Sequence, residues 1–177
     1  MTDPATLDAY GVLTEPDTLT IQRLMPGPIE RVWSYLTESD LRARWLASGT
    51  MELKAGAPFE LVWRNDELTD PPGHKPDGFG DEHRMQSRIV AADAPSRLVF
   101  TWGENGEVSI ELEEKGDEVL LTLVHTRITD RNAKLMIGAG WHMHLDVLVA
   151  RVSDGTTEPF WDGWLRLKGD YDRRIPA

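Results

Sequence analysis

Cysteine is absent from the 177 residues of this sequence. Without thiols the chain forms no internal disulfide, binds no zinc or iron–sulfur cluster through thiolates and uses no cysteine nucleophile. Positive charge is also scarce, because 19 Lys and Arg residues stand against 30 Asp and Glu residues and the formal net charge is −11. A surface of this sign repels the phosphate backbone of nucleic acids, so we expect no nucleic-acid partner.

Long apolar runs are missing as well. No stretch comes near the roughly 20 apolar residues that span a bilayer, and the first residues lack the cationic and apolar regions of a secretory signal. The sequence therefore predicts a cytoplasmic protein that does not insert into membranes. At this length one domain buries roughly 70% of the surface of its unfolded chain, so an apolar core suffices for folding.

Several motifs that usually carry catalysis are missing too. The sequence has no Gly-x-Ser-x-Gly elbow, no phosphate-binding loop ending in Gly-Lys-Ser/Thr, no Gly-x-Gly-x-x-Gly and no His-Glu-x-x-His. Hydrolase, nucleotide-binding and dinucleotide-binding functions therefore lack their usual residues. We predict no cofactor.

One long helical pattern, over about 129–152, dominates what is present. Its apolar stripe consists of Gly138, Trp141, Leu145, Leu148, Val149 and Val152, with Leu135 and His142 on its flank. Gly138 and Gly140 lie inside the pattern, where each costs about 1 kcal/mol of helix stability relative to alanine. Two such residues predict the close approach of another backbone, a kink or room left for a ligand.

The chain before this helix alternates between apolar and polar residues. This period of two predicts strands over 10–14, 18–24, 59–64, 85–90, 98–102, 108–113 and 119–125. Pro28 suits the first turn of a helix, and apolar residues at helical spacing follow it, so we expect a helix over 28–37. Ser39 is a suitable cap for a second short helix over 40–46. The strands are expected to form an antiparallel meander.

Two further segments differ from this pattern. Residues 65–82 form a long loop rich in Pro, Gly and acidic side chains, and such loops are usually lids, binding loops or mobile segments.

If the tail after Gly155 is helical, it aligns Phe160, Trp164, Leu167 and Tyr171 on one side. We expect that side to cover the outer apolar line of the long helix, which consists of Met136, Met143 and Val147, unless a second subunit does so in a homodimer. The predicted division is a flexible leader (1–9), one domain (10–155) and an aromatic-rich extension (156–177).

The side chains expected between the sheet and the long helix form the candidate binding site. The set consists of Phe59, Leu61, Trp63, Met85, Phe100, Trp102, Leu123, His125, Trp141, His142 and Leu145. A cavity with such a lining suits a hydrophobic or aromatic ligand, with tryptophan N–H groups and histidine as its few polar contacts. An ordinary packed core is the alternative.

The histidines are the candidate groups for acid–base chemistry. His142 and His144 point roughly 200° apart on a helix, so they do not chelate one metal ion, and we predict no metal site. His142 and Asp146 share a helix side, where a hydrogen bond would orient the imidazole. No catalytic residue is assigned, and His125 and His142 are the candidates for an acid–base role.

Three local sequences carry a resemblance to a known family. They are Arg-Leu-Met-Pro-Gly-Pro-Ile-Glu-Arg-Val-Trp (23–33), Leu-Arg-Ala-Arg-Trp (41–45) and Gly-Trp-His-Met-His-Leu-Asp (140–146). Together with the order of elements over about 10–154, they closely resemble the AHSA-like branch (activator of heat-shock-protein ATPase homologues) of the START/pollen-allergen-like SRPBCC superfamily. The resemblance implies an α+β helix-grip fold. In that fold an antiparallel sheet of about seven strands wraps a long C-terminal helix, two short helices follow the first strand, and a largely apolar cavity is enclosed.

The resemblance leaves three functions open. The leading hypothesis is non-catalytic binding of a small hydrophobic or aromatic molecule. The second is an enzyme of aromatase/cyclase or hydratase type that uses His125 or His142. The third, implied by the family name, is a protein-interaction module that acts on a chaperone ATPase in the stress response. The eukaryotic activator carries an additional amino-terminal domain important for stimulation, for which we expect this chain to have no room.

Overall fold

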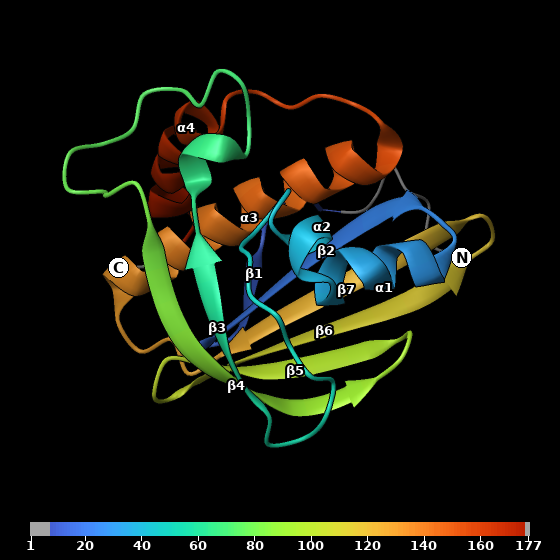
Figure 1. Ribbon diagram of the computed structural model, residues 1–177. Coiled ribbons are helices and arrows are strands. Elements are labelled where there is room, and N and C mark those ends of the chain that lie inside the picture. Colours follow the sequence, from blue (N-terminus) through green and yellow to red (C-terminus); the bar gives the residue numbers. More distant parts are fainter. Residues whose placement is uncertain (1–7, 176–177) are drawn as a thin grey trace.

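Alternating apolar residues build a seven-stranded antiparallel sheet in the computed structural model, which describes residues 8–175 (Figure 1). The strand order is β1-β2-β7-β6-β5-β4-β3. The strands are β1 (Val12–Glu15), β2 (Thr18–Pro26), β3 (Pro58–Trp63), β4 (His83–Asp93), β5 (Arg97–Trp102), β6 (Gly106–Lys115) and β7 (Glu118–Thr126). The predicted sheet is confirmed, and the predicted leader falls almost wholly outside the described residues.

The register of the central strands gathers apolar side chains on one face. Leu123 of β7 lies opposite Ile110 of β6 on one side and Ile21 of β2 on the other, and all three are buried. The next residue of β6, Glu111, is exposed. Because successive side chains of a strand point to opposite faces, one face of the sheet is wet and the other forms the core.

Two short helices follow β2. The first, α1 (Ile29–Thr37), begins directly after Pro28 and buries Val32 and Leu36. The second, α2 (Ser39–Arg42), is shorter than the predicted helix over 40–46. Beyond its end the N–H of Trp45 bonds to a carbonyl only three residues back, so the backbone tightens into turns.

The buried guanidinium of Arg42, the last residue of α2, holds the turns that follow the helix. It donates hydrogen bonds to four backbone carbonyl oxygens, those of Leu36, Thr37, Ala47 and Gly49. A single side chain therefore ties the end of α1 to the segment leading into β3. Burial lowers the pKa of Arg42 to about 10, which still leaves the group charged at neutral pH.

The long helix, α3 (Arg131–Ser153), crosses the concave face of the sheet (Figure 1). The Asp130 side chain caps its first turn by accepting the N–H of Asn132, and Asp154 ends it with a left-handed backbone at φ 55°. The predicted stripe is buried except for the half-buried Val149, and Met143 and Val147 of the second apolar line are buried as well, whereas Met136 is half-buried. Burial on more than one side requires a further element beyond the sheet.

That element is α4 (Phe160–Arg174), which lies along α3 on the side away from the sheet (Figure 1). Glycines bring the two helices close together. A Cβ added at Gly138 of α3 would lie 3.2 Å from Cδ1 of Tyr171, and one added at Gly163 of α4 would meet the sulfur of Met143. The backbones thus approach closely where either residue lacks a side chain.

The architecture is the helix-grip α+β fold that the sequence predicts: a curved antiparallel sheet holds one long helix, with α1 and α2 at one end and α4 as a cover. Among the helices of residues 8–175, none is both long and apolar enough to cross a membrane. The predicted boundaries between leader, domain and extension stay a prediction.

Candidate ligand cavity

A cavity of about 420 Å³ lies between the sheet, the first half of α3 and the start of α4. The sheet contributes Trp63, His83, Met85 and Trp102 from the ends of β3, β4 and β5. The two helices contribute Met136, Ile137, Gly140, Trp141, His144, Phe160, Trp161 and Trp164. Leu46, Asn65 and the segment 78–82 complete the wall.

Aromatic rings dominate this wall. Five of the seven tryptophans of the chain line the cavity, together with Phe79 and Phe160. The rings touch at edges and tilted faces, with centroids 5.5 Å apart for Trp63 and Trp102 and 5.3 Å apart for Trp102 and Trp141. Such offset contacts are the favoured geometry for aromatic pairs, so the rings hold each other in place around the space.

The cavity exists partly because α3 has a glycine at position 140. A Cβ added at Gly140 would meet no atom within 4 Å, unlike one added at Gly138. Of the outcomes predicted for these glycines, Gly138 permits close approach and Gly140 faces open space. A packed interior rarely leaves such room beside a helix backbone.

His144 is the buried histidine of this wall. Its Nδ1 lies 2.8 Å from the carbonyl oxygen of Trp45, and its ring packs on Phe160 with centroids 4.9 Å apart. Burial lowers the pKa of His144 to about 4, although the hydrogen bond to Trp45 acts in the opposite direction. The imidazole is therefore neutral at pH 7.

His125 lies on β7, outside the cavity wall. Its Nδ1 accepts the indole N–H of Trp141 at 2.9 Å, and its ring meets the edge of Trp102. Burial lowers the pKa of His125 to about 4. The residue thus supports two tryptophans of the wall, because it orients Trp141 through a hydrogen bond and packs on Trp102.

His142 lies on the opposite side of α3 from His144, in a cluster with Arg23, Asp146 and Tyr171. Its Nδ1 is 3.0 Å from the Tyr171 hydroxyl, and the oxygen of that hydroxyl accepts the N–H of Gly11. The expected hydrogen bond to Asp146 is not formed, because Nε2 and Oδ2 are 3.6 Å apart. The carboxylate of Asp146 turns to Arg23 instead, at 3.0 Å.

Burial sets the charge states in this second cluster. It lowers the pKa of His142 to about 3, with the positive charge of Arg23 as the next cause. Burial also raises the pKa of Asp146, while Arg23 acts in the opposite direction. His142 is therefore neutral at pH 7, and Tyr171 rather than Asp146 orients its ring.

The structure brings four of the eleven predicted site residues to the cavity: Trp63, Met85, Trp102 and Trp141. The other seven lie in the core or in the second cluster; they are Phe59, Leu61, Phe100, Leu123, His125, His142 and Leu145. Whether any of the eleven contacts a ligand stays a prediction.

The wall also contains residues that the predicted set omits, above all Gly140, His144 and the α4 aromatics. The spacing of Met136, Gly140 and His144, four residues apart on one helix side, was the available signal.

The segment 65–82 lies over the cavity and beside α4, in the upper left of Figure 1. It begins with a short 3₁₀ turn, η2 (Asn65–Glu67). Lys75 bridges Asp66 and Asp81, with both nitrogen–oxygen distances at 2.9 Å, and this contact lowers the pKa of Asp66. Asp66 also accepts the indole N–H of Trp161 at 2.8 Å.

Phe79, near the C-terminal end of this segment, packs on two tryptophans of α4. Its ring centroid is 5.0 Å from that of Trp161 and 5.3 Å from that of Trp164. His74 adds a contact with the Asp162 carboxylate, at 2.8 Å from Nδ1. The segment therefore has the position of a lid, since its own residues close one side of the cavity.

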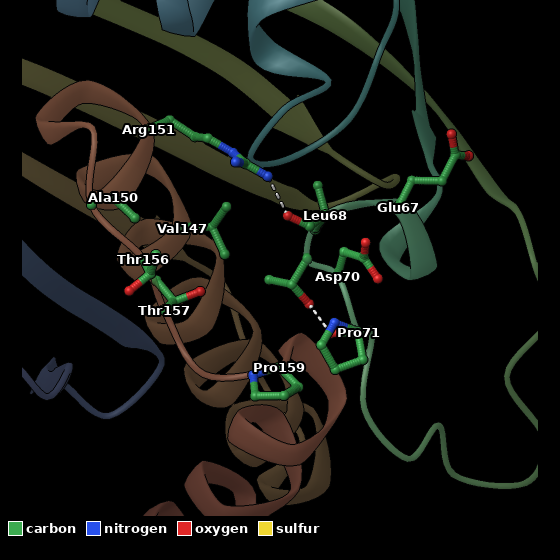
Figure 2. A pocket seen from close by; sticks show the side chains of 12 residues that line it. Glu67, Leu68, Asp70, Pro71, Val147, Ala150, Arg151, Thr156, Thr157 and Pro159 are labelled. Atoms are coloured by element: carbon green, nitrogen blue, oxygen red, sulfur yellow. Dashed lines mark hydrogen bonds between the residues drawn. The ribbon is translucent and has the colours of Figure 1, made fainter.

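A second hollow, of about 300 Å³, lies between the C-terminal part of α3 and the segments 67–71 and 155–159. Figure 2 shows Arg151 reaching across it to the carbonyl of Leu68, at 2.6 Å. Its lining contains no aromatic ring and no histidine. Within residues 8–175, no group of three or more His, Asp or Glu side chains is arranged to hold a metal ion. The aromatic cavity is thus the better candidate site.

Comparisons with known proteins identify relatives of the whole chain. The model of a family described as "Activator of Hsp90 ATPase homolog 1-like protein" matches residues 26–153. The solution structure of the protein encoded by gene BPP1335 of Bordetella parapertussis is 35% identical, with a TM-score of 0.79 over 100% of this chain and 97% of that one. No protein in a search of curated proteins matches.

Two more distant structures share the fold. CalU16 from Micromonospora echinospora is 22% identical, with a TM-score of 0.67 over 90% of this chain and 89% of that one. The conserved protein of unknown function EF2215 from Enterococcus faecalis is 17% identical, with a TM-score of 0.68 over 96% and 87% of the two chains. At these identities the similarity concerns the fold alone.

Proposed function

This chain belongs to the family of Activator of Hsp90 ATPase homolog 1-like proteins, and from its aromatic cavity we propose that it binds a small hydrophobic or aromatic molecule without transforming it. The fold of this family commonly binds hydrophobic ligands. Because one fold serves many functions, the proposal rests on the site itself.

The observation that carries the proposal is the open space in front of Gly140 within a wall of seven aromatic side chains. A volume of about 420 Å³ lies within the usual range of ligand pockets, roughly 300–1,000 Å³. Water beside the aromatic part of this wall finds few polar partners, so an apolar ring that displaces it gains affinity. Burial of apolar ligand surface adds about 25 cal/mol per Å².

Native mass spectrometry of the purified protein is the first test. A bound small molecule that is released on unfolding and identified after extraction would supply the ligand class and the subunit count together. If the protein is empty, titration with fatty acids, flavonoids and polyketides should quench the fluorescence of the cavity tryptophans. Failure of every compound to do so would favour a filled core and contradict the proposal.

A blocking variant locates the binding site. Gly140→Phe places a ring in the open space, and we expect it to abolish ligand binding while the helix persists. Gly169→Phe on α4 is the matched control, because its Cβ lies outside the cavity wall and meets only the Arg173 side chain within 4 Å. Equal loss of binding in both variants would show that the effect is not local to the cavity.

A cyclase- or hydratase-type enzyme is the second proposal, because a neutral histidine lines the cavity. The candidates from the sequence, His125 and His142, lie outside the wall and are bonded to Trp141 and Tyr171. The acid–base role would therefore pass to His144. Incubation of the extracted ligand with the protein tests this: unchanged ligand in the wild type, or equal turnover after His144→Phe, would contradict it.

The family description motivates a third proposal, an interaction with an Hsp90-type ATPase. The measurement is the ATPase rate of the purified chaperone with and without this protein. No change in rate and no capture of the chaperone would close this proposal. A homodimer, a cytoplasmic location and a role in the stress response stay predictions.

A further inference from the structure

The hydrogen bond of His144 fixes the tautomer of its ring. Nδ1 lies 2.8 Å from the backbone oxygen of Trp45. A carbonyl oxygen only accepts hydrogen bonds, so the proton of the neutral ring is on Nδ1 and a lone pair is on Nε2. The lowered pKa of His144 keeps the ring in this neutral form at pH 7. Nε2 is therefore a hydrogen-bond acceptor.

This acceptor has no hydrogen-bond partner within residues 8–175. His144 is only 6% exposed, and it lines the cavity one helical turn after Gly140. Because the Nδ1 edge of the ring is turned to Trp45, the Nε2 edge is the one that remains for the cavity. The missing side chain of Gly140 leaves space beside it.

A second unpartnered acceptor lines the same cavity. Oδ1 of Asn65 is buried and has no hydrogen-bond partner among the described residues. Buried oxygens of this kind are rare in folded proteins, and each one destabilises the fold unless something donates to it. The two acceptors belong to different elements, α3 and η2, and both belong to one wall.

Two of the five indole groups in the cavity wall have an N–H that is already bonded. The N–H of Trp141 is bonded to His125, and the N–H of Trp161 is bonded to Asp66. Neither can turn to His144 or Asn65 without breaking a hydrogen bond at 2.9 Å or 2.8 Å. No hydrogen bond from the described residues reaches either acceptor, so a bound ligand would supply the donor.

We propose that the cavity selects aromatic ligands that carry a hydrogen-bond donor, such as a phenolic hydroxyl, which is received by Nε2 of His144 with Oδ1 of Asn65 as a second acceptor. This inference rests on the proposed function, that the cavity binds an aromatic molecule. The rings supply affinity for any flat apolar molecule, and the two acceptors supply the preference among such molecules.

A matched pair of probes tests the preference. 2-Naphthol donates a hydrogen bond, whereas 2-methoxynaphthalene has the same ring system and no donor. Isothermal titration calorimetry should give about tenfold tighter binding of 2-naphthol, the ratio expected for one net hydrogen bond. Gly140→Phe should remove the binding of both probes, which places them in the cavity.

Two substitutions locate the preference. In His144→Phe most of the preference should disappear, because an aromatic ring remains and the main acceptor is lost, while Asn65 keeps a smaller share. Asn65→Leu should reduce the ratio by a smaller factor, since the histidine remains. Because the two affinities are compared within each variant, any effect of an altered cavity shape that is equal for both probes cancels in their ratio.

A measurement on the unmodified protein covers the case in which His144→Phe does not fold. Addition of 2-naphthol should shift the ¹⁵N resonance of His144 Nε2, which accepts the new hydrogen bond, and leave those of His125 and His142 in place. The methoxy probe should leave Nε2 unshifted.

The outcomes separate the two proposals. Equal affinity for both probes, or an unshifted Nε2 resonance with 2-naphthol bound, would overturn this inference and leave the aromatic-binding function standing. If neither probe binds, both the proposed binding function and the proposed preference are overturned for aromatic molecules of this size. A preference for 2-naphthol that survives His144→Phe and Asn65→Leu would overturn the assignment to these residues.

Discussion

Two rows of residues on α3 have opposite surroundings. The closed row, Gly138, His142 and Asp146, meets Tyr171 of α4 and Arg23 of β2, and the space beside its glycine is filled by a ring. The open row, Met136, Gly140 and His144, lines the cavity, and its glycine has no neighbour. Each row repeats every four residues, and the two lie roughly 200° apart on the helix.

The rows differ in how fully their polar groups are bonded. In the closed row, His142 Nδ1 faces the Tyr171 hydroxyl and Asp146 is paired with Arg23. In the open row, one nitrogen of His144 is bonded and the other is not. A fully bonded, filled interface stabilises the fold, whereas an unfilled one leaves groups available to a ligand. The same helix therefore divides stability and binding between its two sides.

Removal of the Tyr171 ring should have the largest effect, because it opens the closed row. Tyr171→Ala deletes a fully buried ring and leaves Gly138 opposite an empty space. We expect a loss of about 3–5 kcal/mol in the free energy of unfolding, measured by urea denaturation. The N–H of Gly11 and Nδ1 of His142 also lose their partner.

Tyr171→Phe separates the ring from its hydroxyl. It keeps the packing against Gly138 and removes only the two hydrogen bonds, so the expected loss is about 1–3 kcal/mol. A loss in Tyr171→Ala no greater than in Tyr171→Phe would show that ring packing does not hold the closed row together.

Acidification should destabilise the fold through three buried histidines, namely one in each row of α3 and His125 on β7. The folded-state pKa values of His125, His142 and His144 are about 4, 3 and 4, against 6.5 for an ordinary imidazole. The neutral rings are thus favoured in the folded state, so this stability is complete above pH 6.5 and is lost as the pH falls toward the folded values. Each histidine should lower the free energy of unfolding by about 1.4 kcal/mol per pH unit below 6.5.

Urea denaturation at pH 7.5 and pH 5.5 measures this loss. The raised pKa of Asp146 acts in the opposite direction, because the folded state takes up a proton there. His144→Phe removes one of the three titrating rings and should reduce the loss by about one third. Equal stability at the two pH values would show that the buried rings are protonated without penalty.

Alanine at the two glycines should have effects of opposite sign. At Gly140 the new Cβ meets nothing, so the gain in helix propensity, about 1 kcal/mol, is retained. At Gly138 it lies 3.2 Å from a ring that is fully buried and bonded at its hydroxyl, and overpacking of about 1–3 kcal/mol exceeds the gain.

Differences in the midpoint of urea unfolding test this pair. Gly169→Ala on α4 serves as the reference for propensity alone, since its Cβ meets only a flexible arginine. Stabilisation by Gly138→Ala equal to that by Gly169→Ala would show that the closed row has room after all, and the contrast between the rows would fail.

The sequence predicts the elements much better than it predicts the cavity. The strand β3 (Pro58–Trp63) and the helix α3 follow from local periodicity, which requires no knowledge of neighbours. The cavity joins Trp102 of the sheet, Phe79 of a loop and Trp164 of the tail, which are far apart in the chain. Their meeting depends on how α4 docks, and local patterns do not encode that.

The histidines illustrate the same limit. The helical angle correctly places His142 and His144 on opposite sides of α3, and so excludes a shared metal ion. The angle does not reveal which side is covered by a tyrosine and which faces a cavity. The closed row was thus an equally reasonable choice for the site, and only the position of Tyr171 decides against His142 as the histidine of the cavity.

The smallest effect on stability is expected for a substitution at Lys75, in the segment 65–82 that lies over the cavity. Lys75 joins Asp66 and Asp81 near the surface, so Lys75→Met should leave the midpoint of urea unfolding unchanged. The substitution releases the segment that holds Phe79 over Trp161, however, and this should speed the dissociation of 2-naphthol in stopped-flow measurements. Lys115→Met is the control, because it removes an exposed ion pair with Glu113 outside the cavity wall. If the two variants release the probe at the same rate, the ligand does not leave past Lys75. It would then leave the cavity through another part of the wall.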